Sequence, residues 1–326
     1  MKIAILGAGA WGSALAISLS RRHEVTLWAR HPADCEALAR DRVSRYLPEV
    51  ALPPEVAIER DLARAMASTG LVIVATATAG LRETARAVAG IASSVPLAWA
   101  CKGFEESSQL LPHQIIAETL PKSPRVAALS GPSFALEVAR GQPTAIVLAS
   151  MDPDFAAATA AALNTPRLRI YSSSDLIGVE LGGALKNVIA IAAGISDGLE
   201  LGRNARAALV TRGLAEIARL GVAMGGQPET FNGLTGLGDL VLTCTGDLSR
   251  NREVGVRLAR GKKLEQVLSE LGHVAEGVNS ARAALGQARS RGVEMPITQA
   301  VAAVLFEGRP PPEAVQQLLT RDPRRE

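Results

Sequence analysis

The stretch Ile3-Ala-Ile-Leu-Gly7-Ala-Gly9-Ala-Trp-Gly12-Ser-Ala-Leu-Ala16 decides the fold of the first half of the chain. An apolar strand runs directly into Gly-x-Gly-x-x-Gly and then into helix-forming residues, which is the arrangement of a dinucleotide-binding fingerprint. In that arrangement Gly7 permits the tight turn, Gly9 lets the backbone approach a pyrophosphate, and Gly12 lets the helix pack on its strand. The N-terminus of the helix offers unpaired N–H groups to the phosphates. A chance glycine turn before a buried helix is the alternative, and the placement between strand and helix favours the fingerprint.

Short apolar runs continue along the first half of the chain, at residues 24–29, 71–75, 97–100, 126–129, 145–148 and 168–171. Amphipathic stretches separate these runs, and this alternation is typical of parallel strands that are buried on both faces. We therefore expect an α/β fold in which residues 1–175 form a doubly wound, Rossmann-type sheet. Ligands of such a sheet bind at the carboxyl ends of its strands.

The second half of the chain has a different pattern. Residues 181–199, 205–221 and 254 onward carry apolar side chains at helical spacing, without comparable strand runs. This predicts a mainly α-helical domain over residues 176–326, with its boundary near residues 173–177. The prolines of Arg309-Pro-Pro-Pro312 are expected to end the last helix, and the charged tail to Glu326 is expected to be weakly ordered.

Composition limits the function classes. The 326 residues are 48% hydrophobic and 21% charged, as in soluble globular proteins, and the net charge of +3 is small, which argues against nucleic-acid binding. Cys35, Cys101 and Cys244 are widely spaced, which argues against a zinc site or a disulfide framework and favours reduced thiols in a cytoplasmic protein.

Neither a secretory signal nor membrane insertion is expected. The first strand begins at about Lys2, which leaves no room for the charged and apolar regions of a signal peptide. The longest glycine-rich apolar segment carries Lys186 and Asn187 in its middle, so no uninterrupted apolar run reaches the ~18 residues of a membrane helix.

The end of the second strand bears on the choice of dinucleotide. A NAD-selective site usually places Asp or Glu there to accept from the ribose 2′-hydroxyl, whereas this strand ends in Arg30-His31. A guanidinium pairs with a 2′-phosphate, so NADP(H) should be favoured, with NAD(H) also used. A solvated strand end is the alternative interpretation. Trp11, inside the glycine turn, is expected to cover the cofactor rather than fill the core.

Four further clusters carry candidate chemistry. Lys102 and Ser133 each follow a predicted strand, at the sheet edge where a doubly wound fold builds its site, although both could be ordinary loop residues. Lys186 lies within an apolar helix, where a cation is costly unless it is paired or snorkels to solvent. The tripeptide Ser249-Arg250-Asn251 suits phosphate oxygens or a carboxylate, or else forms an exposed loop or a helix cap. Asp239 follows glycines, where a turn aspartate that bonds its own backbone is the alternative.

Several long motifs follow one another between Lys2 and about Phe306: Gly7-Ala-Gly-Ala-Trp-Gly-Ser-Ala-Leu15, Lys102-Gly103, Gly131-Pro-Ser-Phe-Ala135, Glu180-Leu-Gly-Gly-Ala-Leu-Lys-Asn-Val188, Thr211-Arg-Gly-Leu-Ala-Glu216, Gly236-Leu-Gly-Asp-Leu240 and Leu248-Ser-Arg-Asn-Arg252. In these motifs the chain resembles the bacterial NAD(P)-dependent glycerol-3-phosphate dehydrogenases. The resemblance implies reduction of dihydroxyacetone phosphate to sn-glycerol 3-phosphate, which supplies glycerophospholipid synthesis.

The resemblance also implies roles for individual residues. It makes Lys186 the proton-transfer lysine. It places the phosphorylated substrate on Lys102, Gly131, Ser133, Lys186, Asp239, Ser249, Arg250 and Asn251. It places the cofactor on Gly7, Gly9, Trp11, Gly12, Arg30, His31, Lys102, Ala135, Arg250, Val274 and Glu276, with Tyr46 as a further contact. Ala10 departs from the family, which often has Ser there, and the lost hydroxyl is expected to weaken cofactor binding slightly.

Two alternative functions remain open from the residues alone. A 2-hydroxy-acid or 3-hydroxyisobutyrate-type dehydrogenase would keep the two-domain plan and use arginine for a carboxylate. A non-catalytic NADPH-sensing protein would bind the cofactor without turnover, which the presence of both Lys186 and Asp239 disfavours. The chemistry requires no metal, and the sequence is compatible with a homodimer without a diagnostic apolar patch.

Overall fold

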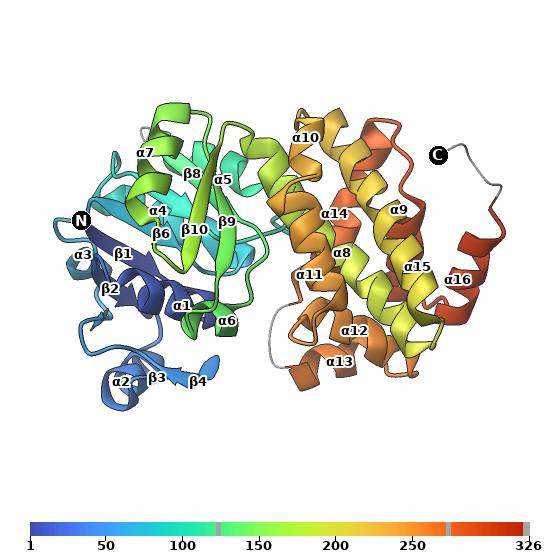
Figure 1. Cartoon of the computed structure of the whole chain (residues 1–326), viewed down its shortest axis with the longest axis horizontal. Helices are drawn as coiled ribbons and strands as arrows, with labels where there is room; N and C mark the ends of the chain where they lie inside the picture. Colours follow the sequence, from blue (N-terminus) through green and yellow to red (C-terminus); the bar gives the residue numbers. More distant parts are fainter. Residues whose placement is uncertain (122–124, 272–274, 322–326) are drawn as a thin grey trace. The chain divides into compact units, whose positions relative to one another are not determined.

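The structure is a computed structural model that describes residues 1–121, 125–271 and 275–321. The chain divides into two compact units (Figure 1). Unit 1 comprises residues 1–102 and 110–179, and unit 2 comprises residues 103–109 and 180–326.

Unit 1 is built on an eight-stranded sheet with the strand order β10-β9-β8-β7-β6-β1-β2-β5. Its strands are β1 (Lys2–Leu6), β2 (Glu24–Trp28), β5 (Ala57–Glu59), β6 (Leu71–Val74), β7 (Leu97–Trp99), β8 (Val126–Ser130), β9 (Thr144–Ala149) and β10 (Leu168–Ser173). The seven strands that the apolar runs predict are all present, which confirms the Rossmann-type α/β fold. The short strand β5 and a separate hairpin of β3 (Val43–Ser44) and β4 (Leu47–Ala51) were not predicted.

Helices cover both faces of the sheet. They are α1 (Ala10–Leu19), α2 (Pro32–Asp41), α3 (Leu62–Ala65), the 3₁₀ turn η1 (Thr78–Gly80), α4 (Leu81–Ile91), α5 (Pro112–Thr119), α6 (Ala135–Ala139) and α7 (Pro153–Leu163). Strand β1 shows how the core forms on both faces: Ile3 and Ile5 join one buried cluster, while Ala4 and Leu6 join another. Successive side chains of a strand point to opposite faces, so an unbroken apolar run fills two cores.

The prediction that all strands are parallel is wrong for β9 and β10. Strand β9 pairs antiparallel with β8, and β10 pairs parallel with β9, so the last two strands run opposite to the rest. The connection from β8 to β9 contains only the five-residue helix α6, about 7.5 Å of helix, which cannot carry the chain back along a strand of about 17 Å. Apolar periodicity does not encode strand direction.

Unit 2 is mainly helical, as predicted. Its elements are α8 (Leu176–Gly198, which begins in unit 1), α9 (Gly202–Ala223), α10 (Pro228–Phe231), the π-helix η2 (Leu234–Gly238), α11 (Asp239–Thr245), α12 (Arg250–Ala259), α13 (Leu264–Leu271), α14 (Glu276–Ser290), α15 (Pro296–Phe306) and α16 (Pro311–Leu319).

Helix α8 is the central helix of unit 2. It is long and apolar enough to cross a membrane by length and composition, but 94% of its most apolar window is buried inside the protein. Every residue from 179 to 196 is buried, which is the pattern of a core helix that is apolar all round.

The prediction that the prolines after Arg309 end the last helix is wrong. Helix α15 ends at Phe306, and Pro311 then occupies the first turn of α16. Proline suits the first helical turn because its missing N–H would have no partner there and its φ is already helical. The same residue type that stops one helix therefore begins the next.

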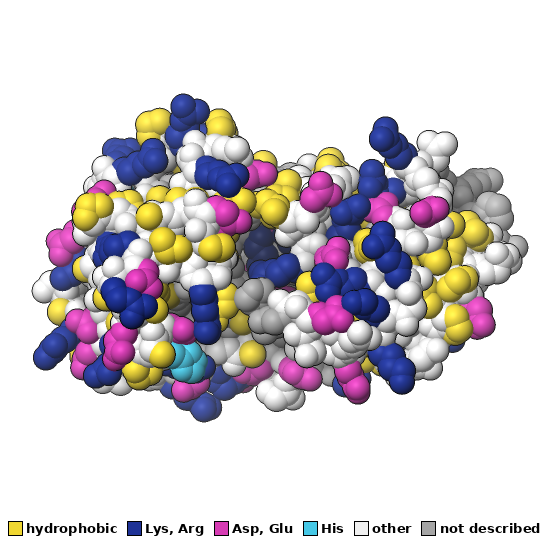
Figure 2. All heavy atoms as spheres, turned by 90° about the horizontal axis from the view of Figure 1, so that it is seen from below, with side chains coloured by type: hydrophobic (Ala, Val, Ile, Leu, Met, Phe, Trp, Pro, Cys, Tyr) yellow, Lys and Arg dark blue, Asp and Glu magenta, His cyan; other side chains and the backbone are white. Residues whose placement is uncertain are grey.

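Charged side chains of both signs are interspersed on the face of the molecule shown in Figure 2. This mixed pattern is typical of a solvated surface, in contrast to the single-sign stripe of a nucleic-acid-binding protein.

Candidate active site

The glycine turn of unit 1 has the shape that a dinucleotide phosphate needs. Gly7 has φ = 121°, and a Cβ on Gly12 would lie 1.9 Å from the carbonyl oxygen of Gly7, so neither position accepts a side chain. Gly9 is the N-cap of α1, and a Cβ there would meet nothing within 4 Å. The close packing explains Gly7 and Gly12, and the open space beside Gly9 leaves room for phosphate against the free N–H groups of α1.

Arg30 and His31 lie at the end of β2, as predicted. His31 is the N-cap of α2 and is exposed. The guanidinium of Arg30 is half exposed and donates from Nη1 to Oε2 of Glu83 at 2.8 Å. Because both side chains of this ion pair are exposed, the pair is compatible with a cofactor contact and with a solvated strand end.

The two aromatic candidates differ in their surroundings. Trp11 is partly buried and packs against the core cluster of unit 1. It therefore contributes to the core, although it was expected to cover the cofactor instead. Tyr46 lies between β3 and β4, where its hydroxyl accepts from Nη2 of Arg45 at 2.6 Å and its ring lies 4.7 Å from the Arg45 guanidinium carbon.

Three substrate candidates come together at the ends of β7 and β8. The ammonium of Lys102 donates to the carbonyl oxygen of Gly131 at 3.3 Å, and the hydroxyl of Ser133 donates to the same oxygen at 3.0 Å. Gly131 has φ = 137°, and a Cβ there would lie 2.9 Å from Cα of Ile146. Ala135 begins α6 directly after this turn. The sheet edge therefore assembles a cationic and hydroxyl-bearing cluster.

Lys186 has a defined partner in unit 2. Its ammonium donates to Oδ1 of Asp239 at 2.5 Å and to Oγ1 of Thr243 at 2.9 Å, and both residues belong to α11. Lys186 is 7% exposed and Asp239 is 1% exposed. The interpretation of Lys186 as a lysine that snorkels to solvent is therefore wrong, and so is that of Asp239 as an ordinary turn aspartate. A buried carboxylate beside an amine favours the protonated ammonium, which is the form that can donate a proton.

Cys244 follows Thr243 in the sequence but does not offer a second reactive group. Burial raises the pKa of its thiol to about 12. The thiol therefore stays neutral at physiological pH, and only the thiolate is a good nucleophile.

Close backbone packing fixes the approach of α11 to α8. A Cβ on Gly182 would lie 2.5 Å from the carbonyl oxygen of Thr235, so α8 lies against the backbone of η2. The π-helix η2 ends directly before Asp239, and π-helical turns are frequent at functional sites. The glycines of the sequence motif thus bring Asp239 close enough to α8 to reach Lys186.

The Ser249-Arg250-Asn251 cluster begins α12. Ser249 is the N-cap, and its Oγ accepts from the backbone N–H of Arg252, so the helix-cap interpretation is correct for this residue. Arg250 is exposed at the first helical position. Oδ1 of Asn251 accepts from the N–H of Gly277 at 3.1 Å, which ties α12 to the start of α14, where Glu276 lies.

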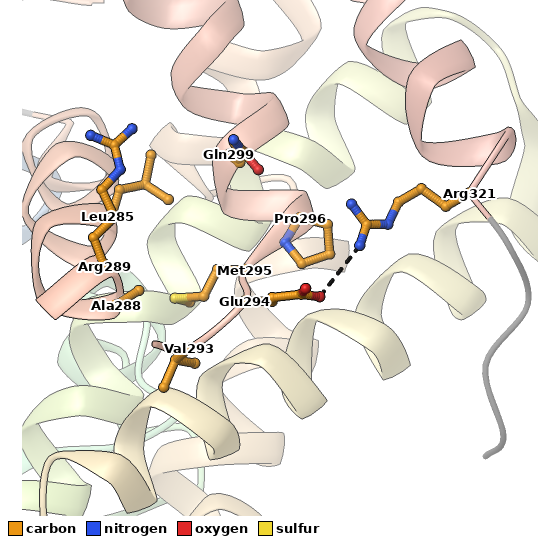
Figure 3. A pocket seen from close by; sticks show the side chains of 9 residues that line it. All are labelled: Leu285, Ala288, Arg289, Val293, Glu294, Met295, Pro296, Gln299 and Arg321. Carbon is orange, nitrogen blue, oxygen red and sulfur yellow. Dashed lines mark hydrogen bonds and ion pairs between the residues drawn. The ribbon is translucent and has the colours of Figure 1, made fainter. Parts of the chain in front are cut away.

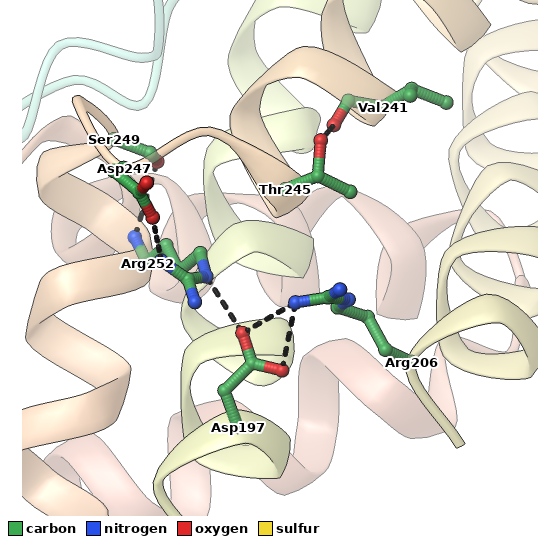
Figure 4. Close-up of polar contacts among 7 residues, drawn as sticks. All are labelled: Asp197, Arg206, Val241, Thr245, Asp247, Ser249 and Arg252. Atoms are coloured by element: carbon green, nitrogen blue, oxygen red, sulfur yellow. Dashed lines mark hydrogen bonds and ion pairs between the residues drawn. The ribbon is translucent and has the colours of Figure 1, made fainter. Parts of the chain in front are cut away.

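A group of charged side chains anchors the same end of α12 (Figure 4). Asp197 of α8 accepts from Nε of Arg252 at 2.7 Å and from Nη1 of Arg206 at 3.1 Å, while Arg252 also pairs with Asp247. The Asp197–Arg252 pair ties α12 to α8, and the Asp197–Arg206 pair ties α9 to the same carboxylate, whereas the Asp247–Arg252 pair lies within the segment that leads into α12.

The described site candidates are divided between the two units, and Val274 lies outside the described residues. Sequence reasoning missed Thr243 and Asp197. The spacing Asp239-x-x-x-Thr243 places both side chains on one helical face and could have revealed Thr243. A pocket in unit 2 is lined by residues of α14, α15 and their connection together with Arg321; it contains none of these site residues, and its lining includes the Glu294–Arg321 ion pair (Figure 3).

Comparisons with known proteins bear on the whole chain. Residues 2–156 match the NAD-dependent glycerol-3-phosphate dehydrogenase N-terminus, and residues 175–316 match the C-terminus of the same family. The glycerol-3-phosphate dehydrogenases [NAD(P)+] of Aromatoleum aromaticum and Dechloromonas aromatica are 55% and 56% identical; each comparison covers 100% of this chain, with 100% and 99% of the relative.

A solved structure agrees with the sequence comparison. The crystal structure of glycerol-3-phosphate dehydrogenase from Coxiella burnetii superposes with a TM-score of 0.94 at 40% identity, over 98% of this chain and 99% of that chain. Matches of this length and identity place the chain in the NAD-dependent glycerol-3-phosphate dehydrogenase family.

Proposed function

We propose that Lys186 is the proton donor and Arg250 a phosphate-binding residue in the reaction of this family. The chain is an NAD(P)-dependent oxidoreductase that reduces dihydroxyacetone phosphate to sn-glycerol 3-phosphate, and the reaction is reversible. The single observation that carries the proposal is the buried contact between Lys186 and Asp239.

The proton has a clear source in unit 2. Reduction of a ketone needs a proton for the developing alkoxide and positive charge to stabilise it. The Lys186 ammonium satisfies both needs, because Asp239 keeps it charged and Thr243 fixes its direction. In the reverse direction the neutral amine accepts the proton from the alcohol.

The phosphate of the substrate requires donors of matching geometry. Arg250 stands exposed at the start of α12, where its planar fork and the free N–H groups of the helix can bind phosphate oxygens. The hydroxyl of Ser249 and the amide of Asn251 support the same site. In unit 1, Lys102, Gly131 and Ser133 form the second group that we assign to the substrate.

We assign residues 1–175 to the dinucleotide and residues 176–326 to substrate binding and catalysis. When bound, the reduced nicotinamide supplies the hydride. The assigned cofactor contacts are the glycine turn, Trp11, His31, Tyr46, Lys102, Ala135, Arg250, Val274 and Glu276, with Arg30 for the 2′-phosphate of NADP(H). The open space at Gly9 and the exposed guanidinium of Arg30 support this assignment.

A cytoplasmic location, a homodimer and a role in supplying glycerophospholipid synthesis belong to the same proposal. The three buried free cysteines support a reducing compartment. Cell fractionation tests the location, light scattering of the purified protein tests the dimer, and phospholipid labelling after gene depletion tests the pathway role. Recovery of the protein outside the cytoplasm would contradict the location, and the mass of a monomer would contradict the dimer. Unchanged phospholipid labelling would contradict the pathway role.

The central experiment follows the oxidation of NADPH and NADH by absorbance with two substrates. Dihydroxyacetone phosphate should be reduced with both cofactors, and unphosphorylated dihydroxyacetone should react far more slowly because it lacks the phosphate contacts. Equal rates with the two ketones would contradict the assigned phosphate residues.

A further inference from the structure

The Arg30–Glu83 ion pair joins two segments on either side of the glycine turn. Arg30 follows β2, and Glu83 lies in the first turn of α4, which follows β6. Both strands are parallel to β1 and flank it, with Leu6 of β1 opposite Trp28 on one side and Val74 on the other. Strands two places apart are separated by about 10 Å, so the two side chains reach toward each other over the carboxyl end of β1.

This position matters because the glycine turn begins at the same end of β1. Arg30 is 53% exposed and Glu83 is 74% exposed, so both charged groups are accessible to a ligand. A bound dinucleotide places its adenosine ribose near the end of the second strand. The ribose therefore meets a guanidinium and a carboxylate that already face each other.

The two charged groups suit different forms of the ribose. A 2′-phosphate needs the guanidinium of Arg30 and is repelled by a neighbouring carboxylate, whereas a 2′-hydroxyl needs an acceptor, which Arg30 cannot provide. The end of β2 lacks the usual acidic residue, but α4 brings a carboxylate to within 2.8 Å of Arg30. Both requirements are thus met by one pair of side chains.

We propose that Glu83 determines the relative affinity for the two dinucleotides: its carboxylate accepts from the 2′-hydroxyl of NADH and competes with the 2′-phosphate of NADPH for Arg30. This inference rests on the proposed role of Arg30. Binding of NADPH requires Arg30 to exchange the carboxylate for the phosphate, while NADH leaves the ion pair intact.

The test is direct binding of NADPH and NADH, measured by nicotinamide fluorescence without ketone substrate. Glu83→Gln removes the charge and keeps the size of the side chain. It should bind NADPH about two- to fivefold more tightly, the range expected for freeing one arginine from an exposed ion pair. It should bind NADH about two- to tenfold more weakly, because a charge-assisted hydrogen bond is replaced by a neutral one.

Glu118→Gln is the matched control. Glu118 lies on α5, and its carboxylate pairs at 2.6 Å with Arg82, the residue before Glu83 on α4. The variant therefore removes the same charge and a comparable ion pair. It should leave both affinities unchanged. If Glu83→Gln shifts the two affinities in the same direction, or behaves as the control does, Glu83 does not select between the dinucleotides.

The variant Arg30→Ala distinguishes a wrong role for Glu83 from a wrong role for Arg30 in binding the 2′-phosphate. If that variant loses NADPH affinity selectively and Glu83→Gln has no opposite effects, only the role of Glu83 is wrong. If Arg30→Ala weakens both dinucleotides equally, the assignment of Arg30 itself is wrong.

Discussion

Gly194 of α8 and Gly255 of α12 bring the backbones of these two helices into direct contact. A Cβ on Gly194 would lie 1.9 Å from the carbonyl oxygen of Arg252, and a Cβ on Gly255 would lie 2.1 Å from that of Ile191. Helix α8 carries Lys186 and α12 carries Arg250, so this contact sets the spacing between the assigned proton donor and the assigned phosphate residue.

Gly255→Ala should therefore disturb both stability and substrate binding. The added methyl group must push α12 away from α8, and overpacking of this kind costs about 1–3 kcal/mol of unfolding free energy. We expect a lower melting temperature and a higher KM for dihydroxyacetone phosphate. Gly90→Ala in α4 is the control, because a Cβ there meets nothing within 4 Å. An unchanged KM for Gly255→Ala would show that the helix spacing does not govern substrate binding.

Thr243 should affect turnover more than binding. Thr243→Val keeps the shape but removes the hydroxyl that accepts from Lys186 Nζ and donates to the Asp239 carbonyl oxygen. Loss of a hydrogen bond to a charged group corresponds to a decrease of about tenfold or more in kcat. Thr243→Ser retains the hydroxyl and should recover most of the activity. Equal kcat values for the Val and Ser variants would exclude a positioning role for the hydroxyl.

Arg250→Lys separates geometry from charge at the phosphate site. The lysine keeps the positive charge but loses the planar fork of two donors. We expect kcat/KM for dihydroxyacetone phosphate to fall by about one to two orders of magnitude, and the rate with dihydroxyacetone to change little. A similar loss with both substrates would show that Arg250 acts on cofactor binding or on folding, and not on the substrate phosphate.

Glu216 predicts a pH dependence of stability in unit 2. It is 1% exposed and accepts from the backbone N–H groups of Ile297 and Thr298 at the start of α15. Burial raises the pKa of this carboxyl above 4.5, although the hydrogen bonds partly oppose the shift. Because the folded state favours the protonated form, this contribution to stability is present below pH 4.5 and is lost as the pH rises through the folded pKa.

Denaturant unfolding of the parent and Glu216→Gln over a pH series measures this effect. The difference in unfolding free energy, parent minus variant, should decrease from about pH 4 upward by about 1.4 kcal/mol for each unit of raised pKa. Glu229→Gln, at an exposed position on α10, controls for loss of charge. A difference that increases with pH would show the opposite sign for the shift.

The sequence predicted the parts of the fold that apolar periodicity encodes. Strand β1 is buried from Ile3 to Leu6 and helix α8 is buried over residues 179–196, so each carries an apolar run whose length distinguishes a strand from a helix. The direction of β9 depends on the short length of α6, and the start of α16 depends on a proline that can either end or begin a helix. The periodicity of apolar residues therefore predicts neither the direction of β9 nor the start of α16.

The site was predictable by residue type but not by contact. Lys186 is conspicuous because a cation in an apolar helix is costly unless it is paired, and Asp239 follows only from the family resemblance; the structure pairs the two across 53 residues of sequence. Asp197 carried no such signal, because it resembles a solvated helix residue until Arg206 and Arg252 are brought to it by the packing of α9 and α12. Contacts of this kind arise only from the tertiary fold.

The most direct test of the account is Lys186→Ala, assayed for both turnover and NADPH binding. The structure places Lys186 with Asp239 and Thr243 in unit 2, and the glycine turn lies in unit 1. We predict a decrease in kcat of at least ~100-fold, as expected for removal of a general acid, with NADPH affinity nearly unchanged. Reduction of dihydroxyacetone phosphate at a rate near that of the parent enzyme would contradict the assignment of Lys186 as the proton donor.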